Sequence, residues 1–349
     1  MSRRPLPDTY AQALGPVPVA RVRAALAGLP PEEPVAVALS AGADSAMLAL
    51  AAALAEPVRP LLAFHVHHGL QAQADDWARR ATQLGGLLGV DVRVAHVDVP
   101  ADGSGIEAAA RAARYTALAR LARRHGVGRV LLAHHRDDQA ETVLLRLLRG
   151  TGVDGMAAMR AQSRRDGLVY LRPWLDLARR DIRQAARAFA GLTGWQAVED
   201  PSNADPRYTR AAVRTALTPL LDARWPGWQA IVARHARQMG EAVEILQEVA
   251  REDFARLQPD EDGRGFGLAP WRVLSPPRQA QVLRYWLAAA GLRMPTEARL
   301  ADLMRQLRQL HALGHDRQLR VVHEGHVIRC HRGRVWLEAL PPPSSGTQP

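Results

Sequence analysis

The stretch from Pro34 to Leu50, PVAVALSAGADSAMLAL, constrains the fold more than any other part of the chain. It begins with an apolar run, Val35–Leu39, whose length and composition are typical of a strand buried on both faces. A turn of small residues follows, and an alanine-rich apolar helix then runs to about Leu54. We therefore expect an α/β protein in which this turn joins a buried strand to a helix.

The turn has the composition of an anion-binding loop. The N–H groups in the first turn of a helix have no partner within the helix, and the helix dipole adds partial positive charge there. Asp44 either caps this helix or holds Mg²⁺ against phosphates bound by the turn. The residues expected to contact a nucleotide are Ser40, Ala41, Gly42, Ala43, Asp44 and Ser45.

Two common phosphate-binding motifs do not account for this turn. A Walker A loop needs a lysine, but the 349 residues contain none, so all 46 basic residues are arginine. The G-x-G-x-x-G spacing of dinucleotide-binding folds is also missing. The pattern that remains, S-[AG]-G-x-D-S, resembles the pyrophosphate loop of the ATP pyrophosphatases, although a purely structural turn is the alternative. Those enzymes usually carry glycine where this chain has Ala41, a change that is tolerable at negative φ and damaging at positive φ.

Strand and helix patterns alternate through the first half of the chain. Three more segments have the pattern of strands: Val58–Val66, Asp91–Val99 and Arg129–Ala133. Such alternation predicts a parallel, doubly wound sheet, whose ligands bind beyond the carboxyl ends of the strands. The small-residue turn, HVHHGL at 65–70 and HHRDDQAET at 134–142 each follow a strand. We expect all three to meet at one edge of the sheet.

Each polar group at that edge has more than one interpretation. Asp138 and Glu141 share one helical face, either as caps matched to the helix dipole or as catalytic groups that face a substrate ammonium. His65 and His67 could form half of a metal site, but without a third ligand at a matching spacing, polar caps or base contacts are favoured. We expect His65 and His134 to lie near the nucleotide.

A helix that begins near Gly105 carries Glu107, Arg111 and Arg114 at helical spacing. These side chains could pair with one another on the surface. Two arginines one turn apart would equally suit a phosphate or a carboxylate. The pattern does not decide between the two interpretations.

Charge and length suggest a second, basic domain. The net charge is +11, and the segment 263–349 holds 13 arginines against 5 acidic residues, which favours a nucleic acid partner over a compositional bias of the source proteome. We expect an ATP pyrophosphatase domain at 1–218, a helical linker at 219–262 built on one long helix, a small α+β domain at 263–340 that binds the nucleic acid, and a disordered tail at 341–349.

Cysteine usage and hydropathy point to the cytoplasm. Cys330 is the only cysteine, so no disulfide or cysteine zinc site is expected. No signal peptide is recognised, and no apolar run reaches the ~20 residues that cross a bilayer. We therefore expect a cytoplasmic protein that does not contact membranes.

Longer motifs narrow the resemblance to the tRNA(Ile)-lysidine synthase family. They are HVHHGL, the helix with Glu107, Arg111, Arg114 and Tyr115, the run LLAHHRDDQAETVLLRLLRGTGVDGMAAM, the segment Arg172-Pro173-Trp174-Leu175 and the run from Trp195 to Arg214. The resemblance is close over about residues 33–215 and looser beyond. Ala211 departs from the family pattern, which usually has asparagine there, and this puts a local tRNA or loop contact in doubt.

The resemblance implies a two-step reaction with ATP and Mg²⁺. The 2-oxo group of the wobble cytidine in the CAU anticodon of isoleucine tRNA is adenylated, and the ε-amine of free L-lysine then displaces AMP to form lysidine. By resemblance Asp44 holds the metal, Asp138 and Glu141 face the ammonium or take its proton, and Arg111 and Arg114 steady developing charge. The residues that the resemblance assigns to the tRNA are Glu107, Arg149, Arg172, Arg210 and Arg214.

Two other functions are alternatives to lysidine formation. A related enzyme that thiolates tRNA would be expected to use paired or persulfide-carrying cysteines, whereas Cys330 is alone and far from the loop. A non-catalytic RNA-binding protein on a degenerate scaffold is supported only by Ala41. The sequence leaves open whether the chain forms a homodimer and whether Gly150–Gly155 closes over the substrate.

Overall fold

The computed structural model describes residues 4–69, 71–98, 106–201, 205, 207, 209–310 and 318–340, without the side chains of 106–108. The chain forms two compact units, Met1–Gly240 and Glu241–Pro349. The division falls within the long helix α11, Trp228–Arg256. A long helix was expected at this place. The expected tail at 341–349 lies outside the described residues.

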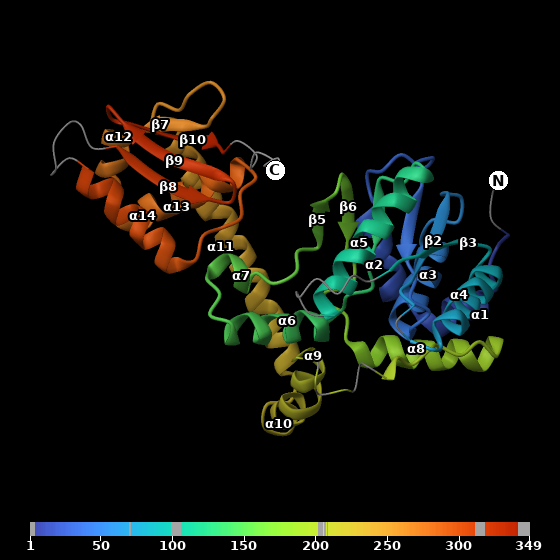
Figure 1. The fold of residues 1–349 in the computed structure, drawn as a ribbon. Helices are drawn as coiled ribbons and strands as arrows, with labels where there is room; N and C mark the ends of the chain where they lie inside the picture. The colour runs from blue at the N-terminus through green and yellow to red at the C-terminus, as the bar shows by residue number, and fades with distance from the viewer. Residues whose placement is uncertain are drawn as a thin grey trace, which may run out of the picture. The chain divides into compact units, whose positions relative to one another are not determined.

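A six-stranded sheet organises the first unit (Figure 1). Its strands are β1 (Val35–Ala38), β2 (Leu61–His67), β3 (Asp91–His96), β4 (Arg129–Leu131), β5 (Gln162–Arg165) and β6 (Leu168–Leu171), in the order β3-β2-β1-β4-β6-β5. All neighbouring strands are parallel except β5, which pairs with β6 in antiparallel register. The predicted doubly wound, mostly parallel sheet is therefore confirmed. Chain order reverses between β1 and β4, which is where such sheets bind ligands.

The β5–β6 hairpin was not expected. Its turn is Asp166-Gly167, and both residues have positive φ, 53° and 80°. A two-residue turn of this composition matches the twist of a hairpin, so the Asp-Gly pair was the sequence signal for it.

Helices cover both faces of this sheet. They are α1 (Asp8–Leu14), α2 (Pro16–Leu26), α3 (Ala43–Ala55), α4 (Ala74–Leu88), α5 (Ile106–Arg124), α6 (Arg136–Leu148), α7 (Val153–Met156) and α8 (Arg179–Thr193). One face packs α2, α3, α4 and α8 against Val35 and Val37 of β1. The other packs α5 against Ala36 and Phe64 (Figure 1). Helix α3 is apolar on every side and almost wholly buried, so the loop before it is held on a rigid element.

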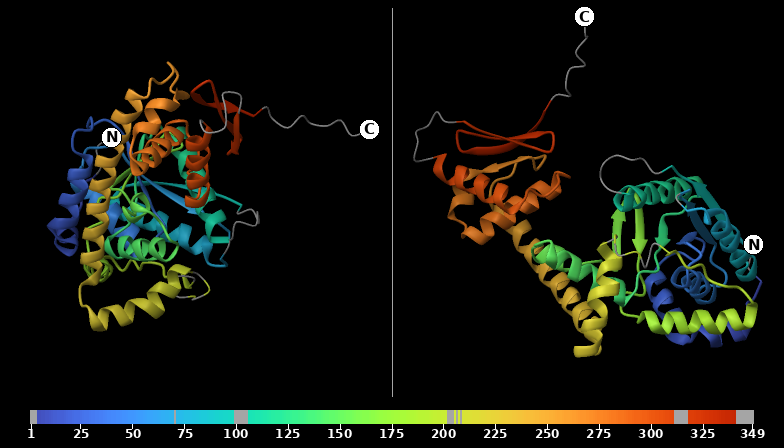
Figure 2. Two further views of the ribbon diagram at one scale, coloured as in Figure 1. Left: turned by 90° about the vertical axis from the view of Figure 1, so that its left-hand side faces the viewer. Right: turned by 60° about the horizontal axis from the view of Figure 1, so that its bottom comes forward.

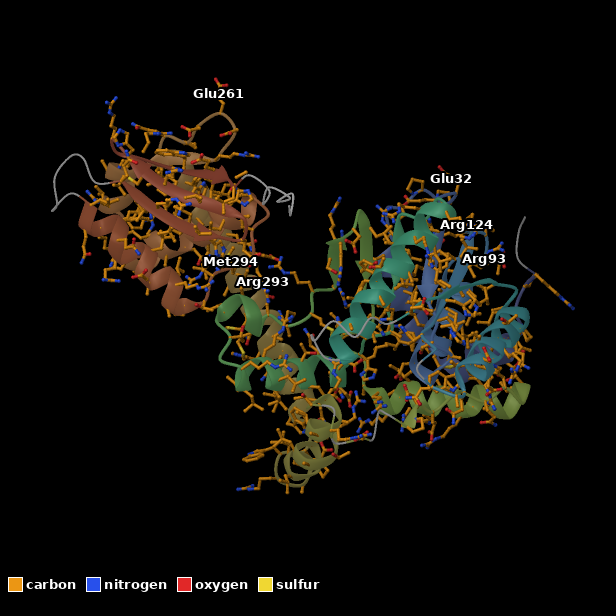
Figure 3. The ribbon with its side chains drawn as sticks, viewed as in Figure 1. Glu32, Arg93, Arg124, Glu261, Arg293 and Met294 are labelled. Carbon is orange, nitrogen blue, oxygen red and sulfur yellow. The ribbon has the colours of Figure 1, made fainter. Side chains whose placement is uncertain are left out.

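The amino-terminal ends of the parallel strands form one edge of the sheet. Glu32 precedes β1, and Arg124 ends α5 shortly before β4, so both mark the amino-terminal end of the parallel strands (Figure 3). The loops discussed below leave the carboxyl ends of the same strands. The segments that connect the strands therefore fall into two groups, one at the amino-terminal ends of the strands and one at their carboxyl ends.

An irregular helical segment follows the sheet. It consists of α9 (Thr209–Ala212), a π-helical turn (Val213–Leu217) and α10 (Thr218–Arg224). The backbone N–H of Thr218 donates to the carbonyl of Val213, five residues back, as a π turn requires. Pro219 follows directly. A proline has no N–H to donate to the carbonyl four residues before it, and in an α-helix its ring clashes with the oxygen of that carbonyl. The extra residue in the turn relieves this clash.

The second unit is a small α+β domain, as expected. Its elements are β7 (Gly265–Gly267), α12 (Leu268–Val273), α13 (Pro276–Ala289), α14 (Glu297–Gln309), β8 (Leu319–His323), β9 (His326–His331) and β10 (Arg334–Ala339). The strands form an antiparallel sheet in the order β7-β10-β9-β8, with α13 and α14 on one face (Figure 2). Trp271, Trp286 and Phe266 are fully buried in its core. Across the described ranges, no helix has the length and apolarity needed to cross a membrane.

Candidate active site

Hydroxyl groups stabilise the loop between β1 and α3. The Ser45 hydroxyl accepts from the backbone N–H of Ser40 at 3.1 Å and donates to the carbonyl of Gly42 at 3.0 Å. The Ser40 hydroxyl oxygen lies 3.1 Å from the Ser45 hydroxyl oxygen, and it accepts a hydrogen bond from the backbone N–H of Gly42 at 3.3 Å. His65, at the end of β2, hydrogen bonds through Nδ1 to the carbonyl of Leu39, 2.8 Å away. The loop is therefore held in shape before any ligand binds.

Ala41 has the backbone conformation that the sequence marked as damaging. Its φ is +64°, and its side chain is fully buried. A residue with a Cβ pays about 1–2 kcal/mol in the left-handed region relative to glycine. Two features offset this cost, since the methyl group packs in the core with α3 and the carbonyl of Ala41 accepts from the N–H of Val198 at 3.0 Å.

The loop after β4 meets the loop after β1 at His135. This buried residue caps α6: its Nδ1 accepts from the N–H of Asp138 at 3.3 Å, and its own N–H donates to the Asp138 carboxylate at 3.2 Å. Its Nε2 lies 3.6 Å from Oδ2 of Asp44 and 3.4 Å from Oδ2 of Asp138. The two loops on either side of the switch point therefore share one cluster of charges. Sequence reasoning did not select His135, although it stands directly before the first helical turn.

Burial alone would lower the pKa of His135, but the hydrogen bond to Asp44 and the charges of Asp138, Asp44 and Asp137 outweigh it, so the pKa is raised. The bond that Nδ1 accepts from Asp138 opposes protonation. The carboxylates dominate because they face the ring from several sides. Asp137 is itself engaged elsewhere, since its Oδ2 accepts from the N–H of Arg179 at the start of α8, at 3.0 Å.

Asp44 fits the role of a metal ligand. Its Oδ1 is buried and has no hydrogen-bond partner among the described residues. A buried carboxylate oxygen without a partner is costly, and Mg²⁺ prefers ligands of this kind. The donor set therefore suits a magnesium ion held jointly by Asp44 and the phosphates of a nucleotide.

Glu141 is held by two arginines from the irregular helix. Arg214 binds it in bidentate fashion, with Nε 2.6 Å from Oε1 and Nη2 2.8 Å from Oε2. Nη2 of Arg214 also lies 3.4 Å from Oδ1 of Asp138. Arg210 adds an ion pair to Glu141 at 3.4 Å and a hydrogen bond to the Thr142 hydroxyl at 2.9 Å. Both oxygens of Glu141 are therefore engaged within the protein.

Asp138 and His134 differ in charge at neutral pH. Burial would raise the pKa of Asp138, but the charges of His135 and Arg210 and the hydrogen bond from the backbone N–H of His135 outweigh it and lower the pKa, so this carboxylate is ionised. Burial lowers the pKa of His134 to about 3, and the charges of Arg172, Arg114 and Arg111 act in the same direction against the opposing effect of Asp138. His134 is therefore neutral, and its buried Nδ1 has no partner among the described residues.

A cluster of arginines surrounds Tyr115 on the α5 side. The guanidinium groups of Arg111, Arg165 and Arg114 lie 5.3, 4.5 and 5.8 Å from the centre of its ring. Burial would raise the pKa of Tyr115, but Arg111, Arg114 and Arg172 outweigh it and lower the pKa. Concentrated positive charge beside an aromatic ring suits a nucleobase and its phosphate. Arg165 lies on the unexpected hairpin and was missed.

A cavity of about 1120 Å³ opens beside the loop. Gly42, Ala43 and Asp44 form part of its wall, together with Arg179 and Arg183 of α8. Its size exceeds that of a typical small-molecule site. The start of α3 thus faces a large space lined with arginine.

The segment 150–159 is fastened to α6 in the structure. Nη1 of Arg146 donates to the carbonyls of Gly155 and Ala158, at 2.7 and 3.1 Å. The buried side-chain amide of Gln139 bonds the backbone of Met159 in both directions, each at 2.9 Å. These hydrogen bonds hold the segment against α6.

The remaining residues assigned from sequence lie in different settings. Arg172 is buried and donates to the carbonyl of Arg160 and the hydroxyl of Ser163, so its guanidinium holds the chain before β5. Arg149 is exposed at the end of α6. Glu107 belongs to the first turn of α5, and its side chain lies outside the described residues.

A mostly parallel sheet with a hydroxyl-rich loop after β1 and a carboxylate cluster after β4 defines a PP-loop nucleotide-binding protein. The model of the PP-loop domain family matches residues 18–221, and a model described as the TilS substrate binding domain matches residues 266–336.

Curated relatives narrow the class further. A tRNA(Ile)-lysidine synthase from Bordetella bronchiseptica is 66% identical over 320 residues, covering 91% of this chain and 93% of the relative. Proteins of the same name from Bordetella pertussis and Polaromonas naphthalenivorans are 67% and 40% identical, covering 87% and 92% of this chain and 95% and 98% of theirs. The chain belongs to the tRNA(Ile)-lysidine synthase family.

A solved structure supports the fold alone. The U34-tRNA thiolase NcsA from Methanococcus maripaludis, solved with its [4Fe-4S] cluster, superimposes with a TM-score of 0.52 at 16% sequence identity, covering 64% of this chain and 78% of its own.

Proposed function

We propose that this protein joins lysine to the wobble cytidine of the CAU anticodon of isoleucine tRNA, using ATP, and so forms lysidine. Membership of the family supports the reaction. The observation that carries it is the meeting of Asp44, from the loop after β1, with His135 and Asp138, from the loop after β4. In this proposal, the loop after β1 binds phosphate, and the neighbouring carboxylates receive an ammonium group.

In the first step, the 2-oxo oxygen of cytidine bonds to the α-phosphorus of ATP, and the bond to the β-phosphate oxygen breaks. The hydroxyl-stabilised loop around Ser40 and Ser45, with the free N–H groups of α3, is suited to bind the leaving pyrophosphate. Asp44 would hold Mg²⁺, which supplies charge neutralisation on the phosphates. His135 orients Asp44 and Asp138 by contacting both carboxylates.

In the second step, the ε-amine of lysine bonds to C2 of the base, and the bond from C2 to the oxygen that carries AMP breaks. We assign the contact with the lysine ammonium to Asp138, because it is ionised, and its single contact with Arg214 is long, at 3.4 Å. Glu141 is engaged by Arg214 and Arg210, so we assign it the role of holding these arginines beside Asp138. The attacking amine must lose a proton, and we assign the acceptance of this proton to Asp138.

The cluster of Arg111, Arg114 and Arg165 around Tyr115 is assigned to the base and its phosphate. The exposed Arg149 and the basic domain at 263–340 are assigned to more distant parts of the tRNA. The catalytic part would then be 1–218, and 219–262 would link it to that domain. We further propose that the protein works in the cytoplasm.

Thiolation of tRNA is the alternative function for this protein. It requires a reactive thiol or persulfide, but Cys330 is buried in the core of the second unit, where burial raises its pKa. A thiol of this kind is a poor nucleophile. The observation therefore favours lysine transfer.

The test is mass spectrometry of nucleosides from unmodified isoleucine tRNA with a CAU anticodon, incubated with the protein, ATP, Mg²⁺ and lysine. Cytidine should gain the mass of lysine less water, and the gain should disappear when lysine or ATP is left out. An elongator methionine tRNA with the same anticodon is the matched control. A sulfur-sized mass change, or no change with a folded protein that binds both substrates, would contradict the proposal.

A further inference from the structure

The four-stranded sheet of the second unit packs only one of its faces against helices (Figure 2). Side chains alternate along β10: Val335 and Leu337 are buried in the core, whereas Arg334, Trp336 and Glu338 point to the other face. The same alternation in β9 buries Cys330 and turns Arg329 and His331 outward. The outward face is therefore polar, basic and partly aromatic.

The register places arginine beside the tryptophan. Arg320 of β8 pairs with Arg329 of β9, and Arg329 pairs with Trp336 of β10. His331 stands opposite Arg334 in the neighbouring row. A cavity of about 410 Å³ lies against these strands, with Arg329, His331 and Trp336 in its wall. The three strands thus present a half-buried indole flanked by a row of guanidinium groups.

The charges on this face are not all used within the protein. Arg329 pairs with Glu338, and Arg334 pairs with Asp260. Arg320 is exposed and has no acidic partner within the described part of the chain. Nδ1 of His331 is buried and likewise lacks a partner among the described atoms. The face therefore has positive charge and a hydrogen-bonding group available for a ligand.

A half-buried indole on the same sheet face as several arginines has the chemistry that binds unpaired nucleotides. Bases stack on aromatic side chains with little dependence on sequence, and guanidinium groups contact the phosphates on either side. A double-stranded stem offers no free base face and would use the arginines alone. The cavity beside Trp336 favours an inserted base.

We propose that this open sheet face binds an unpaired nucleotide of the tRNA, with the base stacked on Trp336 and its phosphate contacted by Arg320. This inference rests on the proposed function for the identity of the RNA. It goes beyond the match to a substrate binding domain, because it names the face, the contact residues and the single-stranded character of the ligand.

The test uses the full-length chain and measures tRNA affinity by filter binding over a range of salt concentrations. Trp336→Ala should raise the Kd for tRNA roughly 5- to 150-fold, which is the range for one lost stacking contact, with an unchanged salt slope. Trp336→Phe should retain most of the affinity, since any aromatic face stacks. Arg320→Gln should instead reduce the slope of log K against log salt by roughly 0.7–0.9.

Arg299→Gln is the matched control. Arg299 is exposed on α14, on the helical side of the same unit, and has no acidic partner in the described structure. Arg299→Gln removes the same charge as Arg320→Gln, but it should leave the Kd and the salt slope near those of the unaltered protein. An effect equal to that of Arg320→Gln would show a general charge effect and overturn the proposal.

Two further measurements keep the proposal testable if Trp336→Ala does not fold. Short single-stranded RNA of mixed sequence should compete with tRNA for the unaltered protein better than duplex RNA of equal charge. Photo-crosslinking of 4-thiouridine-substituted tRNA should label peptides from β9 and β10. Competition by the duplex alone, or labelling confined to other peptides, would overturn the inference.

The outcomes separate this inference from the proposed function. Lysidine formation by the unaltered protein, combined with an unchanged Kd in folded Trp336→Ala, would reject the stacking site and leave the activity standing. Absence of lysidine formation, combined with the expected effects on Kd, would reject the proposed activity and leave the stacking site standing.

Discussion

The guanidinium group of Arg214 binds both carboxylate oxygens of Glu141, which lies 73 residues earlier in the chain. This pair ties the irregular helix after the sheet to α6, at the point where α6 carries Asp138. Because Glu141 is only 4% exposed, its charge depends on Arg214 for compensation. The pair is therefore both a structural link and part of the electrostatics of the site.

Arg214→Gln should destabilise the protein by about 3 kcal/mol, the lower end of the range for breaking a buried ion pair. It removes the bidentate partner of a buried carboxylate, whereas the longer ion pair from Arg210 remains. Arg214→Lys should recover only part of this loss, because an ammonium cannot make the bidentate contact. Urea unfolding gives the free energies. The double variant Arg214→Gln with Glu141→Gln should be more stable than Arg214→Gln alone. Additive losses would show that the two side chains are not coupled.

The two steps of the reaction should respond to different carboxylates. Asp44→Asn should lower the rate of pyrophosphate release by more than roughly 100-fold, whether or not lysine is present. Asp138→Asn should raise the lysine requirement roughly 10- to 150-fold, the effect of one lost charge-assisted contact, while adenylated tRNA still forms. Trapping adenylated tRNA from α-labelled ATP, beside a lysine titration, measures both quantities.

Glu141→Gln is the comparison variant for this experiment. It should raise the lysine requirement less than Asp138→Asn, because the structure engages Glu141 with arginines instead of leaving it free. If the lysine requirement rises only in Glu141→Gln, the ammonium contact belongs to Glu141, and Arg214 must move when lysine binds.

Ala41→Gly should change stability by less than about 1 kcal/mol. Glycine removes about 1–2 kcal/mol of strain at φ +64°. It also gives up about 0.8 kcal/mol of buried methyl group and about 0.4–1 kcal/mol through a freer unfolded chain. The larger side chain of Ala41→Val should cost at least about 2–3 kcal/mol, as it adds a β-branch to a fully buried, left-handed residue. Thermal and urea unfolding of both variants test this. Equal stability of all three proteins would show that the loop adapts to its residue.

His134 should weaken the protein in acid. Its pKa is lowered to about 3 in the folded state against an ordinary value of 6.5, so the unfolded chain binds a proton first as the pH falls. Its contribution to stability is complete above pH 6.5 and is lost between about pH 6.5 and 3, by about 1.4 kcal/mol for each pH unit. His134→Gln should flatten the stability profile over this range. His65 and His68, whose pKa values burial also lowers, and Asp138, whose pKa is lowered too, add slope of the same sign. The raised pKa of His135 acts in the opposite direction.

Cys330→Ala should leave lysidine formation intact. The side chain is 3% exposed in the core of the second unit, so the expected cost is about 1–2 kcal/mol of stability. Cys330→Ser should cost more, because the hydroxyl would be buried in an apolar core. Loss of turnover in a folded Cys330→Ala protein would return thiolation to consideration.

Strand and helix positions in the first half of the chain could be predicted because their patterns are local. The apolar run at 35–39 and the acid-rich start of α6 each carry their own signal, and the alternation of strands with helices predicts a parallel sheet but not the order of its strands. Helix α8 was not anticipated, since no side chain within it caps its start. Its first N–H is bonded instead by Asp137, 42 residues away.

The composition of the site could be predicted, but not its pairing. Asp44, Asp138 and Glu141 were chosen from motifs, and the structure brings them into one cluster. Sequence spacing could not show that Glu141 is occupied by Arg214, or that His135 joins the two loops, because both contacts depend on the fold. The φ of Ala41 was also undetermined, since alanine has no local signal for the left-handed region.

The π turn at Val213–Leu217 constrains the number of residues in this segment. A deletion of one residue there would restore ordinary α-helical winding. A π turn fits one residue more into nearly the same rotation, so the helix after the deletion would keep its direction, but Pro219 would again meet the carbonyl four residues before it. Natural variants of this segment should therefore exchange residues freely at its exposed positions while keeping their number unchanged.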